Sequence, residues 1–150
     1  MSEIEVFVDL RVAPSVVWNA IEPIETHVEW MADAVTIRFM TDQRRGVGTI
    51  FLCDTKVGPI RLTDRMEITE WIPEHAIGVR HTGVVSGIGR FTLTSIDDGQ
   101  QTRFGWSEQL EFPWWLGGLI GELLGGKFVL KFIWRRNLRA LKLIVEAETE

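Results

Sequence analysis

The segment after Gly126 places the strongest constraint on how this chain can fold. Its apolar residues recur at helical spacing and its basic residues fall mainly on the other face, which predicts an amphipathic helix of several turns. The apolar stripe comprises Leu130, Ile133, Trp134, Leu138, Leu141, Ile144 and Val145. Such a helix cannot bury its stripe alone, and almost everything before it has the pattern of β-strands. We therefore expect one long helix packed on a sheet.

Length and composition indicate one globular domain, residues 1–150. The chain has 45% hydrophobic and 25% charged residues, which is ordinary for a folded protein. Seven Trp and eight Phe without any Tyr favour an apolar interior over a polar network. The net charge of −5 argues against a nucleic-acid partner.

The single cysteine and the N-terminus indicate where the protein resides. Cys53 excludes an internal disulfide, fits a reducing compartment, and is expected to be a small apolar filler in a strand. The acidic, alternating N-terminus is not typical of a signal peptide. The most apolar window, residues 112–126, is too short to span a bilayer. We expect a soluble, cytoplasmic protein.

The first part of the chain predicts a strand followed by two short helices. Apolar residues alternate with polar ones from Ile4 to Val12, and only Phe7 departs from this pattern. Pro14 suits the first position of a helix that Pro23 ends. A capping box of Thr26 and Glu29 would begin the second helix.

The middle of the chain predicts six further strands, over residues 35–39, 49–57, 60–72, 76–82, 88–97 and 101–112. The connections are short, and Asp98-Gly99 between the last two strands is a hairpin signal. Short connections between successive strands imply an antiparallel meander.

These elements and several local motifs resemble the START-like, Bet v 1-like helix-grip superfamily, particularly its bacterial polyketide cyclase/dehydrase and lipid-transport (SRPBCC-type) branch. The motifs are the turn Gly46-Val47-Gly48-Thr49, the strand end Glu70-Trp71-Ile72-Pro73, Gly99 with Thr102, and Phe112-Pro113. The resemblance covers about residues 4–148. It implies an α+β helix-grip fold, in which a curved antiparallel sheet of about seven strands surrounds the C-terminal helix and encloses a cavity. Members of this group bind or transport lipids and other hydrophobic molecules, and some are enzymes.

Strand alternation places three ionisable residues on the apolar, inward faces. Asp64 shares a face with Leu62 and Met66, His81 lies on the side of Val79, and Glu108 lies on the side of Trp106. They could be an acid/base set for catalysis, with His81 as proton shuttle. They could equally anchor the polar end of a ligand, or have a structural role only. The sequence leaves these three alternatives open.

Large apolar residues are candidates for the wall of a cavity, namely Trp30 from the second short helix and Met66, Phe91, Leu93 and Trp106 from the strands. A packed core is the simpler explanation for them. The Gly-rich segment 113–121 adds Trp115 and Leu119 as candidates for ligand contact. Its composition fits a loose lid over the cavity. It also fits a surface that contacts a membrane, a second copy of the chain or another protein, and it fits close packing of the helix on a strand.

Other signals argue against a metal or a cofactor. His27, His75 and His81 are far apart in the sequence, and there is no zinc-binding or phosphate-loop motif. The basic stripe of Lys131, Arg135 and Arg139 is either a solvated helix face or a contact for anionic lipid headgroups.

The most consistent interpretation is a protein that binds or transports a small hydrophobic molecule, such as a lipid, a polyketide or an isoprenoid-like compound. The alternative is a cofactor-independent cyclase or dehydratase. A protein-partner module that uses Trp114 and Trp115 fits less well. The expected partners are the ligand and, transiently, a membrane surface, and we expect a monomer or a homodimer.

Overall fold

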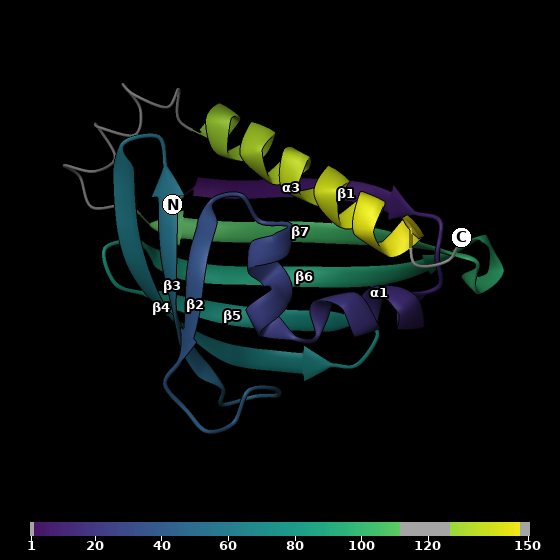
Figure 1. The fold of residues 1–150 in the computed structure, drawn as a ribbon. Coiled ribbons are helices and arrows are strands. Elements are labelled where there is room, and N and C mark those ends of the chain that lie inside the picture. The colour runs from purple at the N-terminus through teal and green to yellow at the C-terminus, as the bar shows by residue number, and fades with distance from the viewer. Residues whose placement is uncertain (1, 112–126, 148–150) are drawn as a thin grey trace.

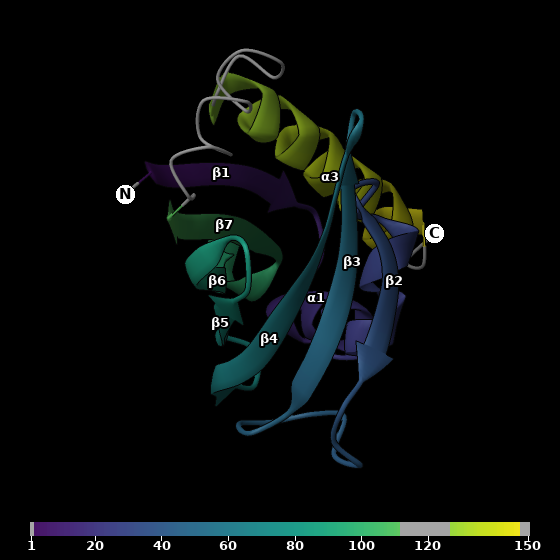
Figure 2. The same ribbon diagram turned by 90° about the vertical axis from the view of Figure 1, so that its left-hand side faces the viewer.

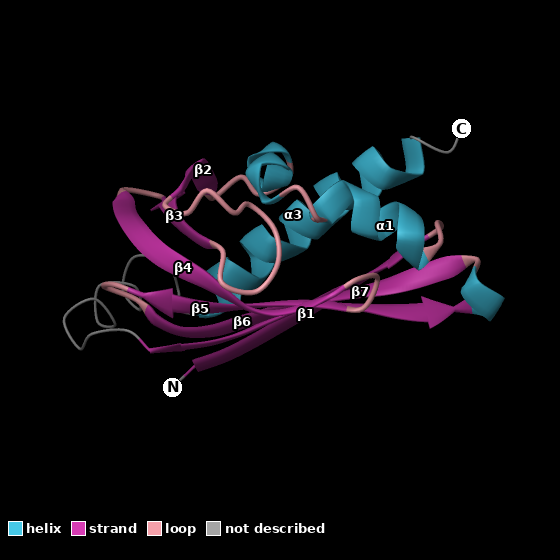
Figure 3. Ribbon diagram, turned by 90° about the horizontal axis from the view of Figure 1, so that it is seen from below, coloured by secondary structure: helices cyan, strands magenta, loops and turns pink. Residues whose placement is uncertain are grey.

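The computed structural model describes residues 2–111 and 127–147, where one seven-stranded antiparallel sheet carries the helices on one side (Figures 1 and 3). The elements in chain order are β1 (Ser2–Leu10), α1 (Pro14–Ile21), the 3₁₀-helix η1 (Ile24–Glu29), β2 (Ala34–Phe39), β3 (Ile50–Val57), β4 (Ile60–Ile72), β5 (Ala76–Thr82), β6 (Ser86–Ile96), η2 (Asp97–Gly99), β7 (Gln101–Glu111) and α3 (Lys127–Ala147). This arrangement confirms the expected α+β helix-grip fold.

The strands follow the order β1-β7-β6-β5-β4-β3-β2, so that the first strand pairs with the last and the others form a meander. The expected ranges 60–72 and 76–82 agree with β4 and β5 residue for residue. The sheet bends, and β2, β3 and β4 rise on the side that carries the helices (Figures 2 and 3). This bend gives the sheet a concave face for α3 to lie on.

Helix α3 buries the predicted apolar stripe. Leu138, Leu141 and Val145 are at most 1% exposed, and Ile133 and Ile144 at the edges of the stripe are half-buried. No helix within the described ranges is long and apolar enough to cross a membrane.

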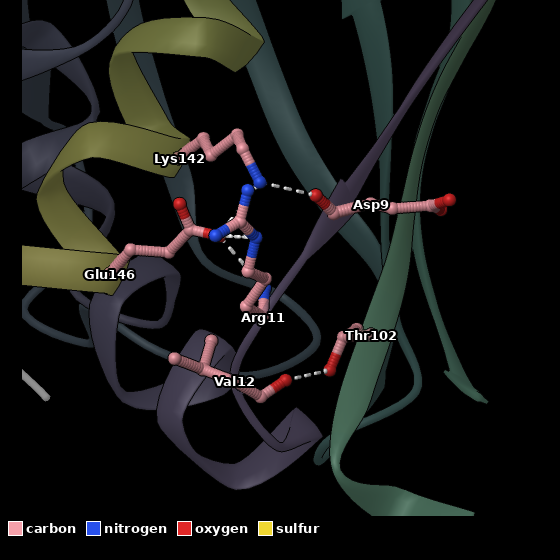
Figure 4. Close-up of polar contacts among 6 residues, drawn as sticks. All are labelled: Asp9, Arg11, Val12, Thr102, Lys142 and Glu146. Carbon is pink, nitrogen blue, oxygen red and sulfur yellow. Dashed lines mark hydrogen bonds and ion pairs between the residues drawn. The ribbon is translucent and has the colours of Figure 1, made fainter. Parts of the chain in front are cut away.

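Polar contacts hold the C-terminal half of α3 to the end of β1 (Figure 4). Lys142 Nζ donates to the carbonyl oxygen of Asp9 at 2.9 Å and to Glu146 Oε1 at 2.7 Å. Glu146 Oε1 also accepts from the backbone N–H of Arg11 at 3.0 Å. Just beyond β1, the hydroxyl of Thr102 donates to the carbonyl of Val12 at 2.8 Å. The side chains of Lys142 and Glu146 therefore fix the C-terminal half of α3 to the sheet, in addition to its apolar packing.

Phe7, which departs from the alternation of β1, lies on the outer face of the sheet and is 55% exposed. It pairs with Gly105 of β7. A Cβ added at Gly105 would lie 3.0 Å from Phe7 Cε1, so the ring covers the space that the glycine leaves. An aromatic side chain over a glycine on the neighbouring strand is a recognised way to support a sheet.

The two short helices differ in how well the sequence predicts them. Helix α1 begins at Pro14 as expected. The capping box was wrong, because η1 is a 3₁₀-helix that already begins at Ile24. The Thr26 hydroxyl donates to the carbonyl of Pro23 at 2.7 Å and caps no helix N-terminus.

Candidate functional site

A cavity of about 160 Å³ lies between the concave face of the sheet, η1 and the N-terminal half of α3. Its wall is mostly apolar and takes side chains from nearly every strand and from α3, including Ile37, Phe51, Ile60, Ile77, Leu110 and, from the helix, Leu130. The residues come from both ends of the sequence because the bend in the sheet brings β2–β4 over β5–β7. The cavity is the candidate site that the fold class implies.

His81 of β5 and Glu108 of β7 form a buried pair on one wall of this cavity. Their Nε2 and Oε1 atoms are 2.9 Å apart, and the side chains are 5% and 9% exposed. The strand between them carries Gly89, whose added Cβ would lie 2.8 Å from Glu108 Oε1 and 3.2 Å from His81 Nε2. The absence of a side chain at Gly89 therefore lets two residues meet across an entire strand.

The surroundings of His81 favour its charged form. Burial lowers the pKa of His81, but the hydrogen bond to Glu108, the charge of Glu108 and the charge of Asp64 together outweigh it, so the net pKa is raised. A carboxylate can only accept, so Nε2 carries the hydrogen in this pair. The other ring nitrogen, Nδ1, is buried and has no hydrogen-bond partner among the described residues.

Asp64 of β4 is the third ionisable group of the wall. It is 7% exposed, and its Oδ1 atom also has no hydrogen-bond partner in the described part of the chain. Burial raises the pKa of Asp64 to about 6, the charge of His81 opposes that shift, and the charge of Glu108 adds to it. Since Met66 is directly opposite His81, Asp64 is the diagonal neighbour of His81 on the same face.

Asp33, just before β2, also lines the cavity and was missed by the sequence reasoning. Its carboxylate accepts hydrogen bonds from Asn137 Nδ2 at 2.7 Å and from Trp134 Nε1 at 3.3 Å. Asn137 is 1% exposed, and its Oδ1 accepts from the backbone N–H of Ala32 at 3.0 Å. Burial raises the pKa of Asp33 although these hydrogen bonds oppose the shift. The network fixes α3 to the loop before β2.

His27 of η1 is a second cavity residue that the sequence reasoning did not assign to the site. Its Nε2–H donates to the carbonyl of Ile21 at 2.6 Å, and burial lowers its pKa to about 4. The ring is therefore neutral near pH 7. Its ring contacts those of Trp30 and Phe91, which makes it a part of the aromatic packing around the cavity.

The structure brings together most of the residues that alternation placed inward. Asp64, Met66, His81, Phe91, Trp106 and Glu108 all line the cavity. Trp30 and Leu93 are buried at 3% and 4% exposure but lie in the packed core and do not line the cavity. Trp115 and Leu119, like Trp114, lie outside the described residues. Whether any of these residues contacts a ligand stays a prediction.

Neither a metal site nor a reactive thiol is apparent in the described ranges. No group of three His, Cys, Asp or Glu side chains there could hold a metal ion. Cys53 lines the cavity, and burial raises the pKa of its thiol to about 12, so the thiol is neutral. This protonation state suits the filler role expected for Cys53.

Solved structures with the same fold include proteins of diverse origin. The chain is similar to a protein from Thermus thermophilus, with 15% identity, a TM-score of 0.76 and coverage of 99% of this chain and 100% of the other. It is also similar to the Zhui aromatase/cyclase from Streptomyces sp. R1128, with 14% identity, a TM-score of 0.75 and coverage of 99% and 96%. A norcoclaurine synthase point mutant from Thalictrum flavum gives 11% identity, a TM-score of 0.72 and coverage of 99% and 96%. At these identities the likeness shows the fold alone.

A family match covers nearly the whole chain. No curated protein sequence matches it at a significant level. The profile of the family described as polyketide cyclase/dehydrase and lipid transport, however, matches residues 1–146. This range includes every described strand and almost all of α3. The chain is therefore a member of the polyketide cyclase/dehydrase and lipid-transport family, with a helix-grip fold.

Proposed function

We propose that the protein binds a small hydrophobic molecule in the cavity between the sheet and α3, in order to carry or sequester it. The observation that supports this most directly is an apolar cavity of about 160 Å³ with a cluster of polar groups on one wall. Ligand sites typically combine such an apolar lining with a few polar groups that orient the ligand. Burial of the ligand would provide roughly 25 cal/mol for each Å² of apolar surface removed from water.

The volume of the cavity favours a small ligand. An apolar cavity of about 150 Å³ takes up benzene, so the cavity has room for about one substituted ring. A whole lipid or polyketide would require the wall to move apart. A ring-sized compound, or one part of a longer isoprenoid-like or polyketide chain, fits the space as it stands.

Native mass spectrometry of the purified protein, with analysis of its organic extract, tests this proposal. We expect an apolar adduct that is lost on denaturation. The matched variants are Val79→Phe, which adds volume at a half-buried cavity residue, and Val35→Phe at an outward position that is 53% exposed. The first should abolish the adduct and the second should retain it. An adduct that survives in folded Val79→Phe protein would contradict a site in this cavity.

A cofactor-independent cyclase or dehydratase is the alternative, and the buried pair of His81 and Glu108 favours it. When His81 is neutral, Nδ1 could accept a proton from a carbon beside a carbonyl, and the electron pair of that C–H bond would move to the carbonyl oxygen as an enolate. Glu108 would stabilise the imidazolium that results. Exchange of the α-hydrogens of cyclohexanone for deuterium tests this activity. Exchange that is lost in His81→Ala supports an enzyme, and exchange no faster than in buffer counts against one.

We also propose that α3 makes transient contact with an anionic membrane surface during ligand delivery. Phe128 and Phe132, one helical turn apart, are 77% and 56% exposed, and Arg135 and Arg136 follow them on exposed positions. Exposed aromatic residues beside basic ones suit an anionic interface. Vesicles of phosphatidylserine and phosphatidylcholine should sediment the wild type but not the Phe128→Ser/Phe132→Ser variant. The control is Leu143→Ser, at a residue 73% exposed further along the helix. Absence of sedimentation with the wild type would refute this contact.

A further inference from the structure

Two buried polar atoms on the cavity wall have unused hydrogen-bonding capacity. These are Nδ1 of His81 and Oδ1 of Asp64, and neither has a partner among the described residues. Both side chains are more than nine-tenths buried and both line the cavity. Buried polar groups are normally satisfied, because an unsatisfied one costs free energy. A ligand that completes both bonds would remove this cost.

The donor and acceptor roles of the two atoms follow from their partners. The bond from Nε2–H of His81 to Glu108 fixes the ring and leaves Nδ1 as the ring nitrogen without a partner among the described residues. Glu108 and Asp64 both favour the imidazolium, in which Nδ1 carries a hydrogen and donates. The carboxylate of Asp64 can only accept. The wall therefore offers one donor and one acceptor on diagonal neighbours of adjacent strands.

The charge of the wall selects among polar ligand groups. Asp64, Glu108 and Asp33 are carboxyl groups of the wall, and burial raises the pKa of both Asp64 and Asp33, with the charge of Glu108 adding a smaller effect in the same direction. Arg90 is also a wall residue, but its guanidinium is paired with Glu70 at 2.7 Å among exposed side chains. A ligand carboxylate would add a further negative charge. A ligand ammonium group cannot accept the hydrogen bond that Nδ1–H of His81 donates. Its positive charge would also lie beside the positive charge of the imidazolium.

A neutral hydroxyl group has the donor and the acceptor that these two atoms require, because it donates one hydrogen bond and accepts another. We propose that the cavity selects a ligand made of one apolar ring that carries a hydroxyl group, either a phenol or an alcohol. The hydroxyl donates to Oδ1 of Asp64 and accepts from Nδ1–H of His81, while the ring fills the apolar part of the cavity. This inference rests on the proposed function, since it names the ligand class for the same cavity.

Isothermal titration calorimetry with four ring-sized probes tests the inference. Toluene has no polar group, p-cresol adds a hydroxyl, benzylamine is a cation and p-toluate is an anion. We expect p-cresol to bind about tenfold more tightly than toluene, as a hydrogen bond to a charged group would provide. Benzylamine and p-toluate should both bind more weakly than p-cresol.

A matched pair of variants locates the selectivity. Asp64→Leu removes the acceptor and should bind p-cresol and toluene with equal affinity. Asp54→Leu is the control, because Asp54 lies on the other face of the neighbouring strand, where Thr63 donates to it at 2.7 Å. It should keep the preference for p-cresol. Asp64→Asn, which preserves the shape of the side chain, serves as a second variant and should reduce the preference.

The outcomes separate this inference from the proposed function. If toluene binds to the wild type as tightly as p-cresol does, the inference is overturned. The proposed function would stand in that case, because the apolar cavity would still bind a ligand. It is also overturned if p-toluate or benzylamine binds most tightly, or if Asp64→Leu keeps the preference for p-cresol. If none of the four probes binds, the inference and the proposed function both fail.

Discussion

His81 of β5 and Glu108 of β7 hydrogen-bond at 2.9 Å across the intervening strand β6, because Gly89 places no side chain between them. Residues on strands that are not neighbours are usually too far apart to pair, since each strand adds about 4.8 Å. Gly89 therefore determines the geometry of the polar wall although it contributes no functional group. A glycine in β6 thus permits the hydrogen bond between two polar residues of the cavity wall.

Gly89→Ala should break this pair. The new Cβ would lie 2.8 Å from Glu108 Oε1, so the carboxylate has to move away. The pKa of His81 should then fall, because burial continues to lower it while Glu108 no longer raises it to the same extent. We also expect a loss of stability of about 1–3 kcal/mol from the buried groups left unpaired. Histidine NMR titration and urea denaturation measure both effects, with Thr94→Ala on the exposed face of β6 as control. An unchanged titration of His81 would show that Gly89 is dispensable for the pair.

Asp64→Asn should change how stability depends on pH. The folded carboxyl has a pKa of about 6, above its ordinary value of 3.8. The unfolded state therefore releases its proton first as pH rises. Asp64 lowers the stability of the wild type progressively between these two pKa values, and the loss is complete above the higher one. Relative to the wild type, the variant should gain about 3 kcal/mol between about pH 4 and about pH 7. Urea unfolding across this range measures the difference.

Asp54→Asn provides a control of opposite sign. Hydrogen bonds from Thr36 and Thr63 lower the pKa of Asp54, so its carboxylate stabilises the fold above pH 3.8 and this contribution is lost as pH falls through the lower, folded value. This variant should lose a little stability near neutral pH. If both variants respond to pH in the same direction, the environment assigned to Asp64 is incorrect.

His27 should make the protein sensitive to acid. Its pKa of about 4 in the folded state lies below the ordinary value of 6.5, so the unfolded state binds the proton first as pH falls. The wild type should lose about 3 kcal/mol from this group between about pH 6.5 and about pH 4. His27→Gln should lack this component, whereas His75→Gln, at an exposed turn residue, should retain it. Equal acid sensitivity in all three proteins would contradict a buried, neutral His27.

Asn137→Ala should weaken the attachment of α3 to the loop before β2. The change leaves Asp33 Oδ1 and the backbone N–H of Ala32 without their partner. A cost of about 2–4 kcal/mol is expected for two polar groups that lose their hydrogen bonds in a mostly buried position. Arg136→Ala, on the exposed side of the same helix, is the control and should change stability by less than about 0.5 kcal/mol. Chemical denaturation decides between these outcomes.

The sequence predicted the inward faces well because alternation along a strand depends only on local geometry. It placed Asp64, His81 and Glu108 on the concave face, where the structure has them. It did not predict depth, because alternation gives the face of a residue but not its position along the cavity. Leu93 was therefore expected in the wall but lies in the packed core, as does Trp30, which follows η1 and belongs to no strand.

Contacts between distant segments could not be predicted in the same way. Asp33 and Asn137 are separated by 104 positions, and only the bend of the sheet and the path of α3 bring them together. Gly89 carried no visible signal, since a glycine in a strand has several explanations. The Thr26 and Glu29 pattern failed because Pro23 and Ile24 start a 3₁₀-helix before the expected cap.

The central claim is that a small apolar molecule enters the cavity, and a toluene titration followed by methyl NMR tests it most directly. The account predicts shifts that saturate at the cavity-lining methyl groups of Ile68, Ile77 and Val79, with no change at Ile88 and Leu143, which are 53% and 73% exposed. Val79→Phe should abolish the shifts at Ile68 and Ile77. Shifts confined to the exposed methyl groups, or none at saturating toluene, would contradict the claim.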